Sequence, residues 1–320
     1  MIEKRINAIL ITVFMLILLS FGSVLTKMTY SSVSPAAFIY LSMLIGMVSM
    51  TIYTFLIKKE RVPKELMTRK VWSLILQIAF FNFVTGTLGA VALNYMPAST
   101  NSYLSNFIGF ITMGMSAIIL KEFPGLWQIL GAVIAFSGLR VFFPNPPQGE
   151  QLMGTGLILI SILGVAYTNN IARKLALETK NQISNNIIST LAILIGGSVA
   201  VVIYILIDGF PPVVPTTQDW LVIFYNGIIT RAIFLTLWNL VLRTLRSYEA
   251  SILGASTVIF TSILAVIILG EVLEIHQIIG ILLLLIGLLL VQLRGASVKT
   301  IFSGLSEKVH NRFRRPERKD

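Results

Sequence analysis

Cysteine is absent from the 320 residues, and charged residues make up only 12% of them. Without cysteine the chain can form no disulfide, no thiol nucleophile and no cysteine-ligated metal site. A soluble globular protein carries roughly 25% charged residues. The shortage of charge, together with 55% hydrophobic residues, therefore indicates a protein that lies mostly in a lipid bilayer.

The apolar stretches of the chain also lack the ionisable groups that proton transfer and catalysis use. None of the 14 acidic residues lies deep in such a stretch, and the two histidines lie at the start of one and in the tail. Proton-driven exporters of cationic drugs usually use a carboxylate or histidine inside the membrane, and enzymes need paired acids, a metal cluster or a nucleophile with its base. The sequence therefore argues against a carboxylate-based drug/proton antiporter and against an enzyme, and it predicts no cofactor and no metal site.

Long apolar stretches fill most of the chain. A membrane-spanning helix needs ~20 apolar residues, and we expect ten such helices. Their predicted positions are 6–26, 36–57, 71–94, 98–120, 126–143, 153–173, 183–207, 219–242, 248–270 and 275–293. All 11 prolines fall at or outside the ends of these ranges, so no predicted helix carries a proline break. The predicted fold class is an all-α polytopic membrane protein.

Basic residues are concentrated in alternate loops. Of the 25 Lys and Arg residues, 22 lie at the N-terminus, in the loops after the second, fourth, sixth and eighth predicted helices, or in the tail 294–320. Cytoplasmic loops carry an excess of such residues. We therefore expect a multi-pass protein of the plasma membrane (the inner membrane in a bacterium) with both termini in the cytoplasm. The expected partners are the lipid bilayer and a small-molecule substrate, not nucleic acid, and we expect the monomer to be functional.

The two halves of the chain resemble each other. Residues 98–143 align without a gap with 247–292, each pair lying 149 positions apart. Identical pairs include Glu122/Glu271, Gln128/Gln277, Gly131/Gly280 and Gly138/Gly287. Because each half holds five predicted helices, an odd number, the second half must enter the membrane in the opposite direction. Two inverted five-helix repeats are typical of secondary transporters.

Three segments resemble parts of the EamA repeats of the drug/metabolite transporter superfamily. They are ALNYMPASTNSYLSNFIGFITMGMSAIILKE, GTGLILISILGVAYTNNIARKLA and FLTLWNLVLRTLRSYEASILGASTVIFTSILAVIILGEVL. The resemblance covers about residues 6–293 and implies a first repeat at 1–144, a loop at 145–152, a second repeat at 153–293 and a basic tail at 294–320. It also implies that helices 1–4 and 6–9 surround a central cavity. Members move amino acids, other metabolites, nucleotide sugars or drugs.

Arg231 lies in the middle of the eighth predicted helix, about 12 residues from either end. At 1.5 Å per residue this is roughly 18 Å of helix, too far for the guanidinium to reach the membrane surface easily. One interpretation is that Arg231 faces the cavity and binds an anionic group of the substrate, such as a carboxylate. The other is a structural arginine satisfied by asparagine side chains and backbone carbonyls.

Phe234 and Trp238 lie within about 60° of Arg231 on a helical wheel, and we expect them in the same binding wall, although such a stripe also suits packing. In the fourth predicted helix we assign the face with Ser102, Tyr103 and Asn106 to the cavity. The face with Asn101, Ser105, Thr112 and Ser116 is assigned to packing.

Asn82, Tyr167 and Asn170 are further candidates for the binding site, with interhelical hydrogen bonding as an equal alternative. The sequence thus predicts a secondary transporter of small metabolites that works by alternating access, with amino acids or related carboxylate-bearing compounds favoured because of Arg231. The alternatives are an exporter of neutral or cationic drugs or metabolites held by aromatic side chains, and a polytopic membrane enzyme.

Overall fold

The computed structural model describes residues 2–208, 214–245, 250, 254 and 257–292. These residues form helices and loops, with no strand among them. Seven helical segments in this part of the chain are long and apolar enough to cross a membrane: Leu10–Thr29, Pro35–Ile57, Arg69–Ala92, Ala98–Ile119, Glu150–Glu178, Asn185–Asp208 and Thr217–Arg243. Three shorter apolar helices are Leu126–Phe142, Thr257–Leu269 and Ile275–Leu290. The protein is an all-α polytopic membrane protein; that ten helices cross the membrane stays a prediction.

The first half begins with the long helix α1, and α2 and α3 start at side-chain caps. Its elements are α1 (Ile2–Thr29), α2 (Pro35–Thr51), η1 (Ile52–Ile57), η2 (Lys64–Leu66), α3 (Arg69–Phe80), η3 (Phe81–Thr85), α4 (Leu88–Ala92), α5 (Ala98–Ser105), α6 (Ile108–Ile119) and α7 (Leu126–Phe142). The hydroxyl of Ser34 accepts from the backbone N–H of Ala37 at the start of α2. Thr68 caps α3 in the same way. These caps fix where the helices leave the loops.

The described part of the second half also contains long helices and interrupted helical runs. Its described elements are α8 (Glu150–Glu178), α9 (Asn185–Asp208), α10 (Thr217–Tyr225), η4 (Asn226–Ile233), α11 (Phe234–Thr244), α13 (Thr257–Leu264), η5 (Ala265–Leu269) and α14 (Ile275–Gln292). Thr216 and Asp219 form a capping box at the start of α10. Part of the ninth predicted span, 248–270, and the basic tail 294–320 lie outside the described residues.

Four of the helical runs contain a wider, π-helical segment: η1, η3, η4 and η5. None of these segments contains a proline. The helices of this protein are therefore interrupted without the residue that usually signals a break. Two of the segments, η3 and η4, carry residues that line the cavity described below.

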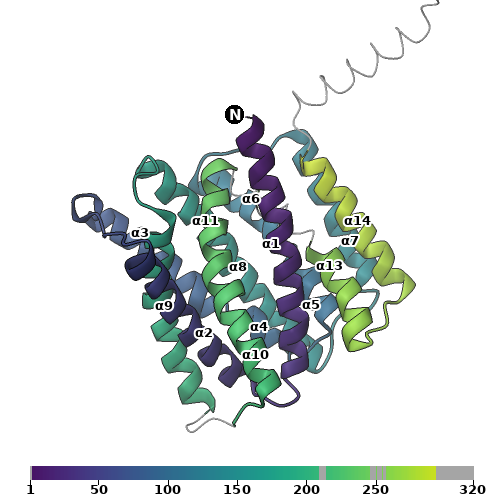
Figure 1. Ribbon diagram of the computed structural model, residues 1–320. Helices are drawn as coiled ribbons and strands as arrows, with labels where there is room; N and C mark the ends of the chain where they lie inside the picture. The colour runs from purple at the N-terminus through teal and green to yellow at the C-terminus, as the bar shows by residue number, and fades with distance from the viewer. Residues whose placement is uncertain (1, 209–213, 246–249, 251–253, 255–256, 293–320) are drawn as a thin grey trace, which may run out of the picture.

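Glycines set the closest helix contacts. A Cβ added to Gly287 of α14 would lie 2.4 Å from the carbonyl oxygen of Gly131 in α7, and one added to Gly138 would lie 3.0 Å from that of Gly280. Helices approach this closely where small residues face each other. These four residues form two of the pairs that lie 149 positions apart in the sequence. Figure 1 shows α7 and α14 side by side at one edge of the molecule.

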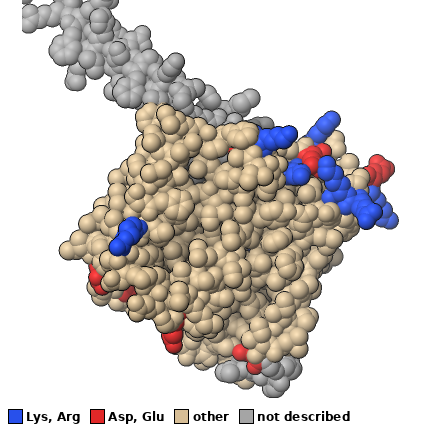
Figure 2. Space-filling view, turned by 180° about the vertical axis from the view of Figure 1, so that it is seen from behind, with Lys and Arg blue, Asp and Glu red and all other residues tan. Residues whose placement is uncertain are grey.

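Charges lie at the two ends of the molecule, and the surface between them is apolar. In Figure 2 most of the visible lysine and arginine side chains gather at the upper end, where α1 begins in Figure 1, while acidic side chains lie along the lower edge and also among the basic ones at the upper end. Exposed apolar side chains such as Ile118, Leu206 and Ile267 suit a surface that faces lipid. Which end faces the cytoplasm stays a prediction.

Candidate substrate-binding cavity

A cavity of about 390 Å³ lies between α1, α3, α5, α8 and the η4–α11 run. Its volume is in the range of small-molecule sites. Apolar side chains of α1, α3, α8 and α11 form much of the wall. The amide side chains on the wall are those of Asn82, Asn101, Asn106, Asn169, Asn226 and Asn239, and the hydroxyls include those of Ser23, Thr87, Ser105 and Thr230.

Arg231 is the only charged residue among the described residues that line the cavity. Its Nε donates a 3.0 Å hydrogen bond to Oγ of Ser42 in α2. Its Nη1 lies 4.0 Å from Sδ of Met43, a weak acceptor. No ion pair joins Arg231 to an acidic residue of the described chain. The guanidinium thus lies at a cavity wall without an anionic partner from these residues.

The position of Arg231 follows from the tight packing of η4 on α2. A Cβ added to Gly227 would lie 2.6 Å from Cγ2 of Ile45 and 2.8 Å from the carbonyl oxygen of Ser42. Gly46 lies across the same contact, where a Cβ would be 3.1 Å from Cβ of Arg231. The two glycines let the backbones approach, and this approach brings Ser42 within hydrogen-bond reach of the arginine.

Two aromatic side chains continue the wall beyond Arg231. The rings of Phe234 and Trp238 stack with centroids 5.5 Å apart and an interplanar angle of 15°. Nε1 of Trp238 donates to Oδ1 of Asn169 in α8 at 2.9 Å, so the indole is held in one orientation. Both rings line the cavity.

Asn106 and Asn82 lie where their helices are interrupted. Asn106 stands between α5 and α6, and Asn82 is in η3. Both line the cavity. The Oδ1 of Asn106 accepts from Thr257 Oγ1 at 3.1 Å, but its buried Nδ2 has no hydrogen-bond partner among the residues that the structure describes. A buried amide donor without a partner is costly, and a bound molecule in the cavity could accept from it.

Comparison with known proteins gives the family. The sequence model of the EamA-like transporter family matches residues 6–144 and again 152–293. The chain belongs to this family. It is also 26% identical over 227 residues to the uncharacterized transporter YcxC of Bacillus subtilis strain 168, a match that covers 67% of this chain and 69% of that protein. The protein is therefore a multi-pass membrane transporter, and the family points away from an enzyme.

A solved crystal structure shares the fold. It superposes with a TM-score of 0.69 at 17% sequence identity, covering 89% of this chain and 97% of that one. At this identity the likeness concerns the fold alone. No group of three or more histidine, cysteine or acidic side chains that could hold a metal occurs in the part of the EamA-like chain that the structure describes.

Four of the predicted site residues lie outside the cavity wall of this EamA-like transporter, in contacts between helices. Tyr103 is fully buried and stacks on Phe142 of α7, with ring centroids 3.8 Å apart. The hydroxyl of Tyr167 donates to Oε1 of Gln77 at 2.5 Å. Nδ2 of Asn170 donates to the carbonyl oxygen of Thr112 at 3.1 Å. Ser102 is buried in α5 and is not among the residues that line the cavity. Arg231, Phe234, Trp238, Asn106 and Asn82 do line the cavity.

The assignment of the two faces of the fourth predicted helix needs correction. Asn101 and Ser105, on the face that the sequence assigns to packing, line the cavity, whereas Ser102 and Tyr103 do not. The reason is the aromatic surface of Phe142, against which the Tyr103 ring packs. Both faces of this helix are polar, so polarity alone could not distinguish them.

The sequence interpretation missed three amides of the cavity, those of Asn169, Asn226 and Asn239. Each lies inside an apolar segment, and an amide at such a position is a signal in itself. Asn226 and Asn239 also bond within the protein: Oδ1 of Asn226 accepts from Thr230 at 2.9 Å, and Nδ2 of Asn239 donates to Ser189 at 2.8 Å.

Proposed function

We propose that this EamA-like transporter is a secondary carrier of small metabolites that bear a carboxylate, amino acids or related compounds, and that the cavity binds them. The observation that carries the proposal is Arg231, a positive charge on the cavity wall without an acidic partner from the described residues. The other described residues that line the cavity are uncharged, so the charge of Arg231 makes the cavity wall positive.

A guanidinium at membrane depth loses hydration, and only an anion or several acceptors can replace it. Ser42 satisfies one of the five N–H donors of Arg231. A substrate carboxylate could take two of the remaining donors side by side, the geometry that arginine binds best. A hydrogen bond to a charged group contributes about 1.5–3 kcal/mol, enough to decide between a carboxylate and a neutral analogue.

The rest of the wall supports a substrate with an apolar part. Phe234, Trp238 and the aliphatic residues of α1 and α8 give apolar surface next to the charge. The unpartnered Nδ2 of Asn106 offers a second donor on the wall. A single charged group with a few amides in an otherwise apolar cavity is the usual composition of a small-molecule site.

We further propose that substrate crosses by alternating access of two inverted repeats, 1–144 and 153–293, joined by the loop 145–152. Two structural features support this. The glycine pairs 149 positions apart form reciprocal contacts between α7 and α14. Lys121 and Gly270, also 149 positions apart, both adopt the left-handed conformation, with φ of 56° and 66°. Exchange of the conformations of two such halves would open the cavity to each side in turn.

We also propose a plasma-membrane location with both termini in the cytoplasm and a functional monomer. The distribution of basic residues supports the orientation, since Lys and Arg gather at the end of the molecule where α1 begins.

A second candidate function has one observation in its favour. The stacked pair of Phe234 and Trp238 could hold a neutral or cationic compound by its ring faces, with Arg231 kept in place by Ser42 as a structural residue. Against a cationic substrate stands the charge of Arg231, which would repel it within the same cavity.

A ligand screen separates the two candidates. The purified protein and its Arg231→Gln and Arg231→Lys variants are heated with amino acids, other carboxylates, nucleosides and cationic drugs, and the melting temperature Tm is recorded. We expect carboxylate-bearing ligands to raise Tm of the wild type and not of Arg231→Gln, with a partial effect in Arg231→Lys, which keeps the charge. Equal stabilisation of all three proteins by neutral or cationic compounds would favour the aromatic site.

A further inference from the structure

Two clusters of charged residues lie beside the cavity, near its two ends. In the first, Nζ of Lys27 in α1 donates to the carbonyl oxygens of Leu93 at 2.5 Å and Met96 at 3.1 Å, which follow α4. Glu271, which follows η5, lies nearby, since its carboxylate contacts Ala98, two residues after Met96. We call Lys27, Leu93, Met96 and Glu271 the Lys27 cluster.

Glu271 also binds the start of α5. Its carboxylate accepts from the backbone N–H of Ala98 at 2.6 Å and from the N–H and hydroxyl of Ser99 at 3.1 and 2.6 Å. The carboxylate thus completes the first turn of a helix from the other half of the chain. The Lys27 cluster therefore joins both halves at one end of the cavity.

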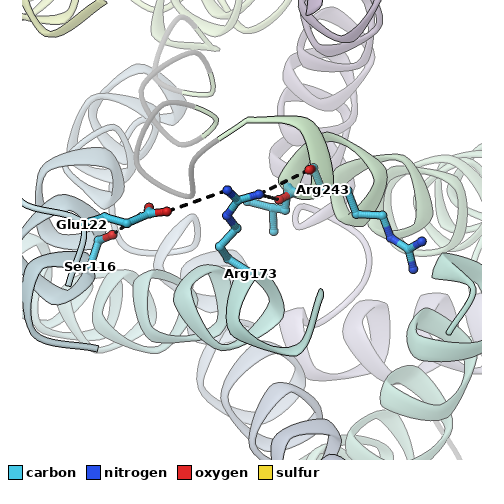
Figure 3. Close-up of polar contacts among 5 residues, drawn as sticks. Ser116, Glu122, Arg173 and Arg243 are labelled. Atoms are coloured by element: carbon cyan, nitrogen blue, oxygen red, sulfur yellow. Dashed lines mark hydrogen bonds and ion pairs between the residues drawn. The ribbon is translucent and has the colours of Figure 1, made fainter. Parts of the chain in front are cut away.

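The second cluster surrounds Arg173 in α8 (Figure 3). Nη1 of Arg173 donates to the carbonyl oxygens of Leu242 at 3.0 Å and Arg243 at 3.3 Å, in the last turn of α11. Its Nη2 lies 3.7 Å from Oε1 of Glu122, which follows α6. The side chains of Arg173 and Glu122 are only 15% and 17% exposed. We call Arg173, Leu242, Arg243 and Glu122 the Arg173 cluster.

Two of the four residues in each cluster occupy corresponding positions in the two halves of the chain. Leu93 and Leu242 lie 149 positions apart, as do Glu122 and Glu271. Lys27 corresponds to position 176, so Arg173 lies within about one helical turn of the matching place. In each cluster a cation of one half contacts carbonyls of that half and lies near a carboxylate of the other half.

Both clusters border the cavity. Leu93 and Thr26 line it beside Lys27, and Leu242 and Ala172 line it beside Arg173. Lys27 is near the end of α1, whereas Arg173 contacts the end of α11, which lies at the end of the molecule where α1 begins (Figure 1). The clusters are therefore at opposite ends of the cavity.

We propose that the Lys27 cluster and the Arg173 cluster are the two gates of this transporter, each closing one mouth of the cavity by tying the halves of the chain together, and that transport opens them in turn. The proposal rests on the alternating access proposed above. It adds the residues whose contacts close each end of the cavity. Loss of one cluster shifts the population toward the state in which that mouth is open, because the contacts that close the other mouth are then left intact.

Cysteine labelling can test the assignment of the two gates, because the chain has no cysteine and single cysteines can be added to it without other changes. Ser23 and Ala172 both line the cavity and lie 149 positions apart, so Ser23→Cys and Ala172→Cys report on the Lys27 and Arg173 ends respectively. The rate of reaction with a membrane-impermeant maleimide is measured from each side of sealed vesicles. No ligand is needed, so the outcome does not depend on Arg231 or on the substrate.

Glu271→Gln and Lys27→Gln should each raise the labelling rate at Ser23→Cys from the Lys27 side by about tenfold and lower that at Ala172→Cys from the opposite side. Glu122→Gln and Arg173→Gln should do the reverse. Glu150→Gln, at an exposed position outside both clusters, is the matched control and should change neither rate. If Glu271→Gln does not fold because the amide offers the start of α5 one acceptor oxygen in place of two, Lys27→Gln carries the test.

Changes in the same direction at both reporters, or unchanged rates in variants that fold, would overturn the assignment of gates. Either result would leave the Arg231 ligand screen valid. Conversely, opposite shifts from the two clusters together with no carboxylate binding would retain the gates and reject the proposed substrate class.

Discussion

Ser42 of α2 accepts a 3.0 Å hydrogen bond from Nε of Arg231 in η4, and this bond sets the direction in which the guanidinium leaves the helix. Nε is taken up by a side chain of the protein, and among the described residues the only contact of the two terminal nitrogens is the weak one of Nη1 with Met43, so both can still donate to stronger acceptors. A serine hydroxyl can thus hold the arginine in place without neutralising it, which keeps its charge available at the cavity wall.

Removal of this hydroxyl tests its positioning role. Ser42→Ala should weaken binding of a carboxylate ligand by about three- to tenfold, since a typical hydrogen bond contributes about 0.5–1.5 kcal/mol, while the loss should be smaller than in Arg231→Gln. Ligand affinity is measured by isothermal titration. Ser137→Ala, which removes an exposed hydroxyl of α7, is the control. Unchanged affinity in Ser42→Ala would show that the cavity does not depend on this bond.

The close packing at Gly227 should make any side chain at that position destabilising. A methyl group there meets Ile45 at 2.6 Å and the Ser42 carbonyl oxygen at 2.8 Å. We expect Gly227→Ala to lower the free energy of unfolding by about 1–3 kcal/mol, the usual cost of overpacking, and to lower Tm accordingly. Gly114→Ala, with no neighbouring atom within 4 Å, should leave Tm nearly unchanged. Equal Tm values for the two variants would contradict the packing seen here.

Asn106 and Tyr103 were predicted to share a face, and the structure separates them. Asn106→Ala should reduce ligand affinity by several-fold because it removes a donor on the cavity wall. Tyr103→Phe should leave affinity unchanged, and Tm should stay the same or rise, since the buried Tyr103 hydroxyl has no hydrogen-bond partner in the described part of the chain. Thermal melts give Tm and titrations give the affinity of both variants. A loss of affinity in Tyr103→Phe alone would place the Tyr103 hydroxyl in the binding site.

The contact between α7 and α14 should matter for stability but not for binding. Neither helix contributes a residue to the cavity wall described here. Gly287→Ala would place a methyl group 2.4 Å from the Gly131 carbonyl oxygen, so we expect Tm to fall while the affinity of the folded protein stays within about twofold. A large loss of affinity without a loss of stability would show that the contact between α7 and α14 affects the cavity.

The sequence predicted the helical class and much of the cavity, because apolar length and a lone charge are visible without a structure. Arg231, Phe234 and Trp238 were found in this way, and all three line the cavity. The predicted helix at 126–143 corresponds closely to α7, Leu126–Phe142. These features depend on composition and short-range spacing, which a helical wheel represents well.

Other parts could not be derived from helical periodicity. The π-helical segments η3 and η4 contain no proline, and the wheel assumes a constant 3.6 residues per turn, so it gave no sign of where these helices widen. Tyr103 was misplaced because its partner, Phe142, lies far along the chain. Contacts of this kind depend on how helices pack, and the sequence of one helix does not contain that information.

The most direct test of the account compares one carboxylate ligand with its carboxamide analogue in both wild type and Arg231→Gln. The ligand is taken from the screen, and four dissociation constants are measured. We predict that the wild type prefers the carboxylate by about ten- to a hundredfold, equivalent to roughly 1.4–3 kcal/mol, and that Arg231→Gln loses this preference. The same preference in both proteins would contradict the claim that Arg231 binds the carboxylate.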